Sequence, residues 1–277
     1  MANTHPANIG DVVKHLVLCE ALATQPRRYI ESHAGAYSYD LATVADPGPG
    51  GIWDFAHAAD ANRDLQNSAY ARIALPLAGT REKPGLYLGS VALGARLLER
   101  GTPIVAAETN TRTAERLRHD AAGADQGQIT VVESDGLDLV VAEARAGDLV
   151  LIDPFDADAK SHGGLTSFDA FTHTAATGAT AVLWHALTPS ATDQQGRGAT
   201  VSRDGADLRI EVHLGRKAAG LQALRLLASN LPDGLANQLV ASDEALLISL
   251  IGGEPAPFLK GSSGARRRTS AYAPRGQ

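Results

Sequence analysis

Four short segments combine acidic, aromatic, histidine and small residues in a way that could do chemistry. They are ESHAGAY (31–37), Glu108, the pair at 135–136 and DPFD (153–156). Each follows a run of apolar residues that predicts a β-strand. The carboxyl ends of parallel strands meet at one edge of a sheet, and α/β proteins bind their ligands there. We therefore expect the four segments to form one site.

The first three segments suit a nucleoside ligand. The small residues from Ser32 to Gly35 let the backbone approach a ligand, and amides in such a turn can bind a carboxylate or phosphate. The carboxylate of Glu108 can accept hydrogen bonds from both hydroxyls of a ribose. Asp135, before Gly136, can accept from an adenine amine. Taken singly, each is also typical of a solvated acid or an ordinary turn at the end of a strand.

The fourth segment suits an amine. Pro154 has no N–H, so the backbone there presents carbonyl oxygens, and Asp153 adds carboxylate oxygens. These acceptors can orient an NH₂ group so that its lone pair faces a methyl carbon. Phe155 can stack on a planar substrate. The candidate catalytic residues are Asp153, Pro154, Phe155 and Asp156.

Strands and helices alternate along most of the chain. Helices are predicted over 10–24, 90–100 and 111–122. Strands are predicted within 27–37, 103–108, 128–136, 148–156, 179–187 and 207–215, a polar loop over 188–206, and either a strand or a short helix over 221–232. Near-continuous apolar strands predict a mainly parallel, doubly wound α/β sheet that is covered on both faces. The alternating pattern at 207–215 predicts an antiparallel edge strand.

Two segments interrupt this pattern. The Pro- and Gly-rich stretch 45–51 opens a segment, 45–87, that we expect to be an inserted helical subdomain, because a structureless connection of that length would be unusual. The main domain would then comprise 1–44 and 88–259. The last segment, 260–277, has five basic and no acidic residues. It is predicted to be a disordered tail, or alternatively a strand of chain that touches phosphates.

Composition excludes several classes of protein. The chain has 25 Lys+Arg and 31 Asp+Glu, a net charge of −6, so without the basic tail it carries −11, which disfavours a polyanionic partner. The single cysteine, Cys19, excludes internal disulfides and thiolate metal sites, and it is predicted to be a small buried hydrophobe. No apolar run approaches the roughly 20 residues of a membrane span. His162, His173 and His185 lack metal-site spacing. We expect a cytoplasmic protein without a metal or membrane contact.

Several motifs together resemble the 23S ribosomal RNA adenine-N6 methyltransferase J family, class I enzymes that use S-adenosylmethionine (SAM). NIGDVVKH (8–15) is similar to that family's GNxADVxKH, and SHAGAYSYDL (32–41) to its THAGAGxYDL. LVLIDPFD (149–156) is similar to LxLIDPPYE. Weaker similarities at LGS (88–90), AVLWHAL (181–187) and SNLP (229–232) extend the resemblance over 8–232.

This resemblance implies a Rossmann-like class I methyltransferase fold, SAM as cofactor, and adenine N6 of large-subunit rRNA as methyl acceptor. An inserted helical subdomain is also a feature of the family. Asp153 and Pro154 would orient the acceptor amine. The residues implied to bind the cofactor are Lys14, His15, Ser32, His33, Ala34, Gly35, Ser90, Glu108, Asp135, Gly136 and Asp153.

The sequence departs from the family at two places and leaves three functions open. DPFD replaces DPPY, so Asp156 puts a carboxylate where an aromatic ring is expected, and Tyr37 replaces a glycine of the loop. The first function is methylation of an rRNA adenine. The second is N-methylation of a small cationic amine or guanidine in specialised metabolism, which Asp156 and the acidic body favour. The third is a non-catalytic SAM-fold binding protein, which both departures favour.

Overall fold

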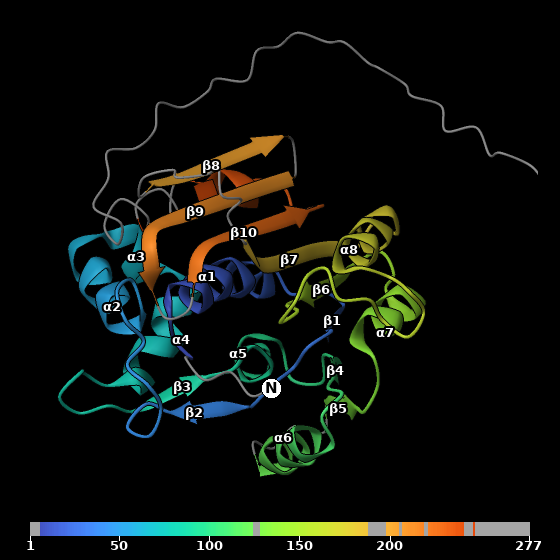
Figure 1. The fold of residues 1–277 in the computed structure, drawn as a ribbon, viewed down its shortest axis with the longest axis horizontal. Coiled ribbons are helices and arrows are strands. Elements are labelled where there is room, and N and C mark those ends of the chain that lie inside the picture. Colours follow the sequence, from blue (N-terminus) through green and yellow to red (C-terminus); the bar gives the residue numbers. More distant parts are fainter. Residues whose placement is uncertain are drawn as a thin grey trace, which may run out of the picture.

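A computed structural model of the chain describes residues 6–123, 128–187, 198–204, 207–218, 221–240 and 246. The predicted basic tail, 260–277, lies outside the described residues. An eight-stranded sheet runs through the centre of the described fold, and a second sheet of two strands lies beside it (Figure 1). None of the described helices is long and apolar enough to cross a lipid bilayer.

Five parallel strands form one half of the large sheet. In sheet order they are β5 (Ile129–Val132), β4 (Ile104–Ala107), β1 (Arg28–Glu31), β6 (Asp148–Ile152) and β7 (Thr180–Leu187). All five confirm strands predicted from apolar runs, and every residue of β6 is buried. The direction in which the chain adds strands reverses at β1, since β4 and β5 lie on one side of it and β6 and β7 on the other. Such a reversal leaves a crevice beyond the carboxyl ends of the strands.

The other half of the sheet is antiparallel. β10 (Leu221–Ser229) pairs with β7 and with β9 (Asp207–Ala218), and β9 pairs with β8 (Gly198–Asp204). The segment 221–232 thus begins as a strand, because neighbours on both sides complete its hydrogen bonds. The strand at the antiparallel edge is β8, which lies within residues 188–206, where a polar loop was predicted. The strand predicted to form the edge, at 207–215, is β9, which lies between β8 and β10. The predicted fold class, a mainly parallel doubly wound α/β sheet with antiparallel strands at one edge, is confirmed.

Helices cover both faces of the sheet. α1 (Ile9–Ala23), α5 (Ser90–Leu97) and α6 (Thr111–Gly123) contribute to one apolar cluster. α7 (Gly136–Glu143) and α8 (Ser167–Ala176) form a second cluster on the opposite face. Neighbouring residues of β1 divide between the two, with Tyr29 in the first and Ile30 in the second, because successive side chains of a strand point to opposite faces.

Three helices lie in the segment predicted to be an insertion. They are α2 (Ile52–Ala61), α3 (Arg63–Asn67) and α4 (Ala69–Ala78). The two strands that flank them, β2 (Ser38–Asp40) and β3 (Leu86–Leu88), pair antiparallel, so the segment leaves and rejoins the fold at one place. The helical character is as expected, while the division of the chain into a main domain and a subdomain at 45–87 stays a prediction.

Helix α1 is enclosed between the sheet and the segment 45–87. Asn8 caps it by accepting from the backbone N–H groups of Gly10 and Asp11. Fourteen of its 15 residues are buried, and it contacts α2, α4, α5 and β6. Cys19 is fully buried on this helix, as predicted, and burial raises the pKa of its thiol. A helix buried on all sides can carry polar residues only where they find partners.

Candidate functional site

The loop after β1 is held by backbone contacts to both neighbouring strands. The N–H of Ser32 donates to the carbonyl of Leu151 at 3.0 Å, and the N–H of Ala34 donates to the carbonyl of Ala107 at 2.9 Å. Gly35 has a φ of +61°, a conformation that favours glycine. The predicted cofactor loop is therefore fixed across the point where the sheet order reverses.

Gly136 allows this loop to pack directly against the start of α7. A Cβ atom at position 136 would lie 1.7 Å from the carbonyl oxygen of Ser32. Two backbones approach this closely only where one residue has no side chain. The glycine predicted to line the adenine pocket is thus required by the contact between the loops after β1 and β5.

Glu108, which follows β4, is tied to the same loop. Its Oε2 accepts from the N–H of Gly35 at 3.1 Å, and its Oε1 accepts from the N–H of Asn110 at 2.8 Å. Each carboxylate oxygen can accept more than one hydrogen bond, and Glu108 is only half-buried, so it can still receive hydroxyl groups of a ligand.

His33 lies among three of the predicted carboxylates. Its Nδ1 is 2.7 Å from the Oγ of Ser32. Burial lowers the pKa of His33, and the negative charges of Asp153, Asp135 and Glu108 act in the opposite direction. The structure therefore gathers the acids that follow β4, β5 and β6 around the loop that follows β1, as the sequence predicts.

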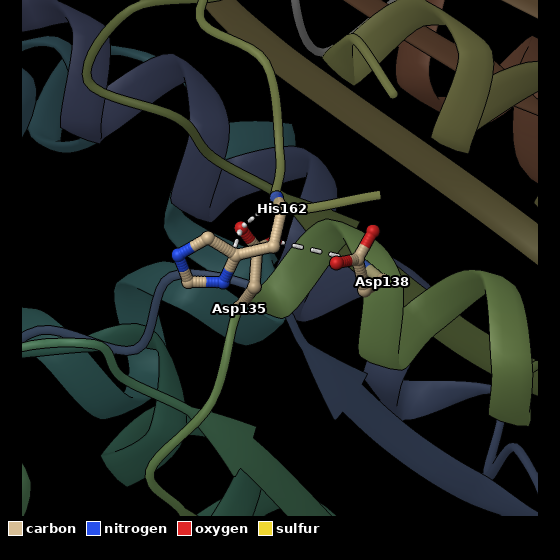
Figure 2. Close-up of side chains that lie close together, drawn as sticks. All are labelled: Asp135, Asp138 and His162. Carbon is tan, nitrogen blue, oxygen red and sulfur yellow. Dashed lines mark hydrogen bonds and ion pairs between the residues drawn. The ribbon is translucent and has the colours of Figure 1, made fainter. Parts of the chain in front are cut away.

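Both carboxylate oxygens of Asp135 accept hydrogen bonds from backbone N–H groups of the protein. Its Oδ1 caps α7 by accepting from the N–H groups of Leu137 and Asp138, and its Oδ2 accepts from the N–H of His162 at 3.1 Å. Asp138 accepts from Ser161 Oγ at 2.6 Å and from the N–H of another loop residue at 2.9 Å. Figure 2 shows the two carboxylates on either side of the loop that carries His162. They anchor this loop to α7.

The same three side chains have the composition of a metal site. Ligand atoms of Asp135, Asp138 and His162 lie within 4.8 Å of one another. The carboxylates, however, already receive the N–H and O–H donors of the loop, and the His162 side chain is 90% exposed. Loop anchoring thus accounts for the cluster, and the absence of a resident metal stays a prediction.

Lys14 forms a buried ion pair with the DPFD motif. Its Nζ lies 2.6 Å from Asp153 Oδ2 and 2.9 Å from Asp11 Oδ1. Burial opposes the positive charge, but the two carboxylates outweigh it and raise the pKa of Lys14 above its usual value. The predicted cofactor-binding Lys14 is therefore engaged with the predicted catalytic Asp153. The sequence analysis missed Asp11, although its spacing of three residues from Lys14 on one helix was a usable signal.

Trp184 lies next to this ion pair, whereas the family resemblance gave it no role. Lys14 Nζ is 5.5 Å from the centre of its ring, within the range of a cation–π contact. A Cβ atom at Gly10 would lie 2.7 Å from the ring, so a glycine of α1 makes room for it. The side chain is half-buried.

Glu31, the last residue of β1, is fully buried behind the loop. Tyr29 donates to its Oε2 at 2.8 Å, and Ser90 donates to its Oε1. Burial raises the pKa of Glu31 to about 8. Ser90, predicted to bind the cofactor, therefore has its hydroxyl engaged by a buried acid at the start of α5.

The DPFD motif divides into a buried and an exposed half. Pro154 is buried, and Asp153 is half-buried. Phe155 is 82% exposed, and the exposed Asp156 accepts from the N–H of Asp158 at 3.0 Å, which closes a local turn. The structure brings the first two residues to the site and leaves Phe155 and Asp156 at its outer surface.

His15 is buried beside Lys14. Its Nδ1 is 2.8 Å from the hydroxyl of Tyr87, and the two rings stack with centroids 5.5 Å apart. Burial lowers the pKa of His15 to about 3. The imidazole is therefore neutral at physiological pH.

Comparison with known proteins supports the fold. No family model and no curated protein matches the sequence. The crystal structure of protein LPL1258 from Legionella pneumophila, of family-model DUF519, is similar with a TM-score of 0.67 and 19% identity, over 90% of this chain and 95% of that one. A methyltransferase from Geobacter sulfurreducens matches with a TM-score of 0.35 and 11% identity, over 78% of this chain and 77% of that one. Such identities concern the fold alone. The chain therefore shares its α/β fold with LPL1258, and the resemblance to the adenine-N6 methyltransferase J family belongs to the proposal below.

Proposed function

We propose that this chain is a SAM-dependent N-methyltransferase related to the adenine-N6 methyltransferase J family. The observation that carries the proposal is that the segments after β1, β4, β5 and β6 meet at the reversal point of the sheet. There Glu108 accepts from the N–H of Gly35, Gly136 packs on Ser32, and the N–H of Ser32 donates to Leu151. Ligands of doubly wound α/β proteins bind at this point. Acids from three different strands there suit a nucleoside that carries a positive charge.

The residues present fit SAM by their chemistry. Gly136 lets the loop after β1 pack directly on the start of α7, and Gly35 takes a left-handed conformation within that loop. Glu108 would accept from the ribose hydroxyls, and Asp135, with its remaining acceptor capacity, would receive the adenine amine. SAM, when bound, supplies a methyl group activated by a sulfonium. The predicted cofactor contacts of Lys14, His15, Ser32, His33, Ala34 and Ser90 belong to this proposal.

Asp153 and Pro154 would hold the acceptor amine. Lys14 occupies Asp153 Oδ2, while Oδ1 has no partner among the described residues. Oδ1 and the backbone carbonyl of Pro154 can therefore accept the amine hydrogens and turn the nitrogen lone pair toward the methyl carbon. Bound SAM would supply the methyl group, with its sulfur as the leaving group, and Asp153 and Pro154 would hold the nitrogen that accepts this group and releases a proton to solvent. Positioning contributes much of the rate, and Asp153 stabilises the positive charge that develops on nitrogen.

Adenine N6 of large-subunit rRNA is the acceptor that the motifs imply. The exposed ring of Phe155, two residues after Asp153, supports a planar acceptor that stacks from outside. Transfer of labelled methyl from SAM to protein-free rRNA tests this proposal, with Asp153→Asn as the inactive reference. We expect labelled N6-methyladenine with the native chain only. No transfer to rRNA together with transfer to small amines would reject the rRNA acceptor.

A small cationic amine is the second candidate. The charge of −11 outside the basic tail and the exposed carboxylate of Asp156 favour a cationic substrate. Mass spectrometry of small-molecule fractions incubated with SAM would reveal a methylated product. Asp156→Asn should then weaken substrate binding far more than SAM binding. An equal loss of both would contradict this candidate.

Calorimetry with SAM, combined with the transfer assays, distinguishes the two proposed enzyme activities from a non-catalytic binding function. The native chain should bind SAM, and Glu108→Gln should bind about 10- to 100-fold more weakly, because a charge-assisted hydrogen bond contributes about 1.5–3 kcal/mol. Glu115→Gln on α6, an exposed acid outside the site, is the matched control. SAM binding without transfer to any acceptor would support the binding protein.

A further inference from the structure

A chain of buried hydrogen bonds joins the candidate site to the segment 45–87. His15 Nδ1 lies 2.8 Å from the hydroxyl of Tyr87, and the hydroxyl of Tyr70 donates to that of Tyr87 at 3.1 Å. His15 belongs to α1, Tyr87 to β3 and Tyr70 to α4. His15 is 3% exposed, Tyr87 2% and Tyr70 0%. Each proton in this chain therefore needs an acceptor within the protein.

Both phenols keep their protons. Burial raises the pKa of Tyr70 and that of Tyr87 above the usual value for tyrosine. A neutral imidazole carries one proton, on either Nδ1 or Nε2, and the other nitrogen is an acceptor. The three residues can thus arrange their protons in only a few ways.

One arrangement gives every buried hydroxyl an acceptor. Tyr70 donates to Tyr87, Tyr87 donates to Nδ1 of His15, and the imidazole proton is then on Nε2. With the proton on Nδ1, either Tyr87 or Tyr70 keeps a buried O–H without an acceptor. The hydroxyl of Tyr70 has no second acceptor among the described residues, so its proton has only the Tyr87 oxygen to bond to. A buried unsatisfied hydroxyl is unfavourable, so the Nε2–H form is preferred.

The preference for the Nε2–H tautomer matters because His15 follows Lys14, a residue of the candidate site. The neighbouring Lys14 is already shared by Asp11 and Asp153, so its ammonium is committed to the protein. Nε2 of His15 has no partner in the part of the chain that the structure describes. A fixed N–H at Nε2 is therefore a neutral donor that the described residues leave available.

We propose that Tyr87 is a positioning residue that holds His15 as the Nε2–H tautomer, so that His15 presents a hydrogen-bond donor to an acceptor atom of the bound ligand. The inference rests on the proposed function for the ligand, while the tautomer itself is a property of the free protein. It also gives the segment 45–87 a role in the site.

Nitrogen-detected NMR of the imidazoles in the full chain at neutral pH tests the tautomer. The His15 signals are identified by their loss in His15→Asn. The native protein should show an unprotonated Nδ1 and a protonated Nε2. Tyr87→Phe should give a mixture of tautomers, because Nδ1 loses its donor. Tyr70→Phe is the matched control, since it also removes a buried hydroxyl but leaves Tyr87 donating to Nδ1. A proton on Nδ1 in the native protein, or an unchanged tautomer in Tyr87→Phe, would overturn the proposal.

Calorimetry with SAM then tests the donor role. Tyr87→Phe should bind SAM about two- to threefold more weakly, because only the fraction of molecules with the proton on Nε2 is competent to bind, and Tyr70→Phe should bind with nearly native affinity. Equal SAM binding by Tyr87→Phe and the native chain, despite a changed tautomer, would overturn the donor role. A native chain with the expected tautomer and no SAM binding would instead reject the proposed function and leave the tautomer assignment standing.

Discussion

The ammonium of Lys14 lies 2.6 Å from a carboxylate oxygen of Asp153, and this ion pair joins residues 139 positions apart. It connects helix α1 to the end of the buried strand β6. Both side chains are largely buried, with exposed fractions of 7% and 17%. The conformation of the DPFD motif therefore depends on a helix that is distant in sequence.

Lys14→Met should destabilise the protein strongly. The free energy of unfolding should fall by about 3–5 kcal/mol, because Asp11 and Asp153 would lose the cation that they share in a buried place. Urea denaturation measures this change. The double variant Lys14→Met, Asp153→Asn should recover part of the loss, since it removes one of the two charges. A double variant less stable than Lys14→Met alone would contradict the ion-pair explanation.

Glu31 should give the stability a distinct pH dependence. Its pKa is raised from 4.5 to about 8 in the folded protein, so between these values the folded chain keeps a proton that the unfolded chain loses. The stabilisation is complete below pH 4.5 and is lost as the pH rises to 8. This group alone contributes a slope of about 1.4 kcal/mol per pH unit.

Urea denaturation of the native protein and Glu31→Gln at several pH values isolates this contribution. The difference in unfolding free energy between the two should shrink or reverse as the pH rises from 5 to 8. Comparison with the variant is needed because His15, with a lowered pKa, loses stabilisation in the opposite direction below pH 6.5. Glu115→Gln should give a constant difference. A constant difference for Glu31→Gln as well would show that Glu31 is ionised in the folded state.

Gly136→Ala should disrupt the loop after β1. The added Cβ would lie 1.7 Å from the carbonyl oxygen of Ser32, so one of the two backbones must move. We expect a loss of at least about 1–3 kcal/mol in stability, typical of overpacking, and loss of SAM binding. Gly123→Ala, where a Cβ would meet nothing within 4 Å, is the matched control. Thermal unfolding and calorimetry report both effects, and two variants with equal behaviour would refute the close approach.

Phe155→Ala should affect the acceptor and leave the fold intact. The ring is 82% exposed, so its removal should change stability by less than about 0.5 kcal/mol. The KM for a planar acceptor should rise about tenfold, because base–aromatic stacking contributes about 1–3 kcal/mol. SAM binding should not change. Phe168→Ala, a half-exposed ring on α8, serves as control, and an unchanged KM in Phe155→Ala would exclude stacking by this ring.

The parallel part of the sheet could be predicted because its strands are buried on both faces. Four consecutive aliphatic residues, Leu149 to Ile152, have no alternative place in a folded chain of this kind. β8 was predicted as a loop because its sequence, GATVSRD, is polar and begins with glycine. An edge strand pairs on one side only, so apolar periodicity says little about it.

The sequence could predict that the acidic residues lie at one edge of the sheet, because each follows a predicted parallel strand. It could not predict which side chains these acids contact. Lys14 was assigned to the cofactor by the family resemblance, and its pairing with Asp153 could not be predicted because spacing along the chain cannot show that α1 lies against the end of β6. The sequence also could not show that Pro154 is buried while Phe155 and Asp156 are exposed. This difference arises because the chain turns toward the surface after Pro154. Glu31 was known to end a strand, yet its burial depends on Tyr29 and Ser90, which reach it from two different elements.

The enclosure of helix α1 has a consequence for synthesis on the ribosome. Nearly all of its residues are buried, and every element that buries it, from α2 to β7, is translated later. Its apolar surface is therefore fully covered only after more than half of the polypeptide has been synthesised. The pairing of Lys14 with Asp153 can form only after β6 has left the exit tunnel.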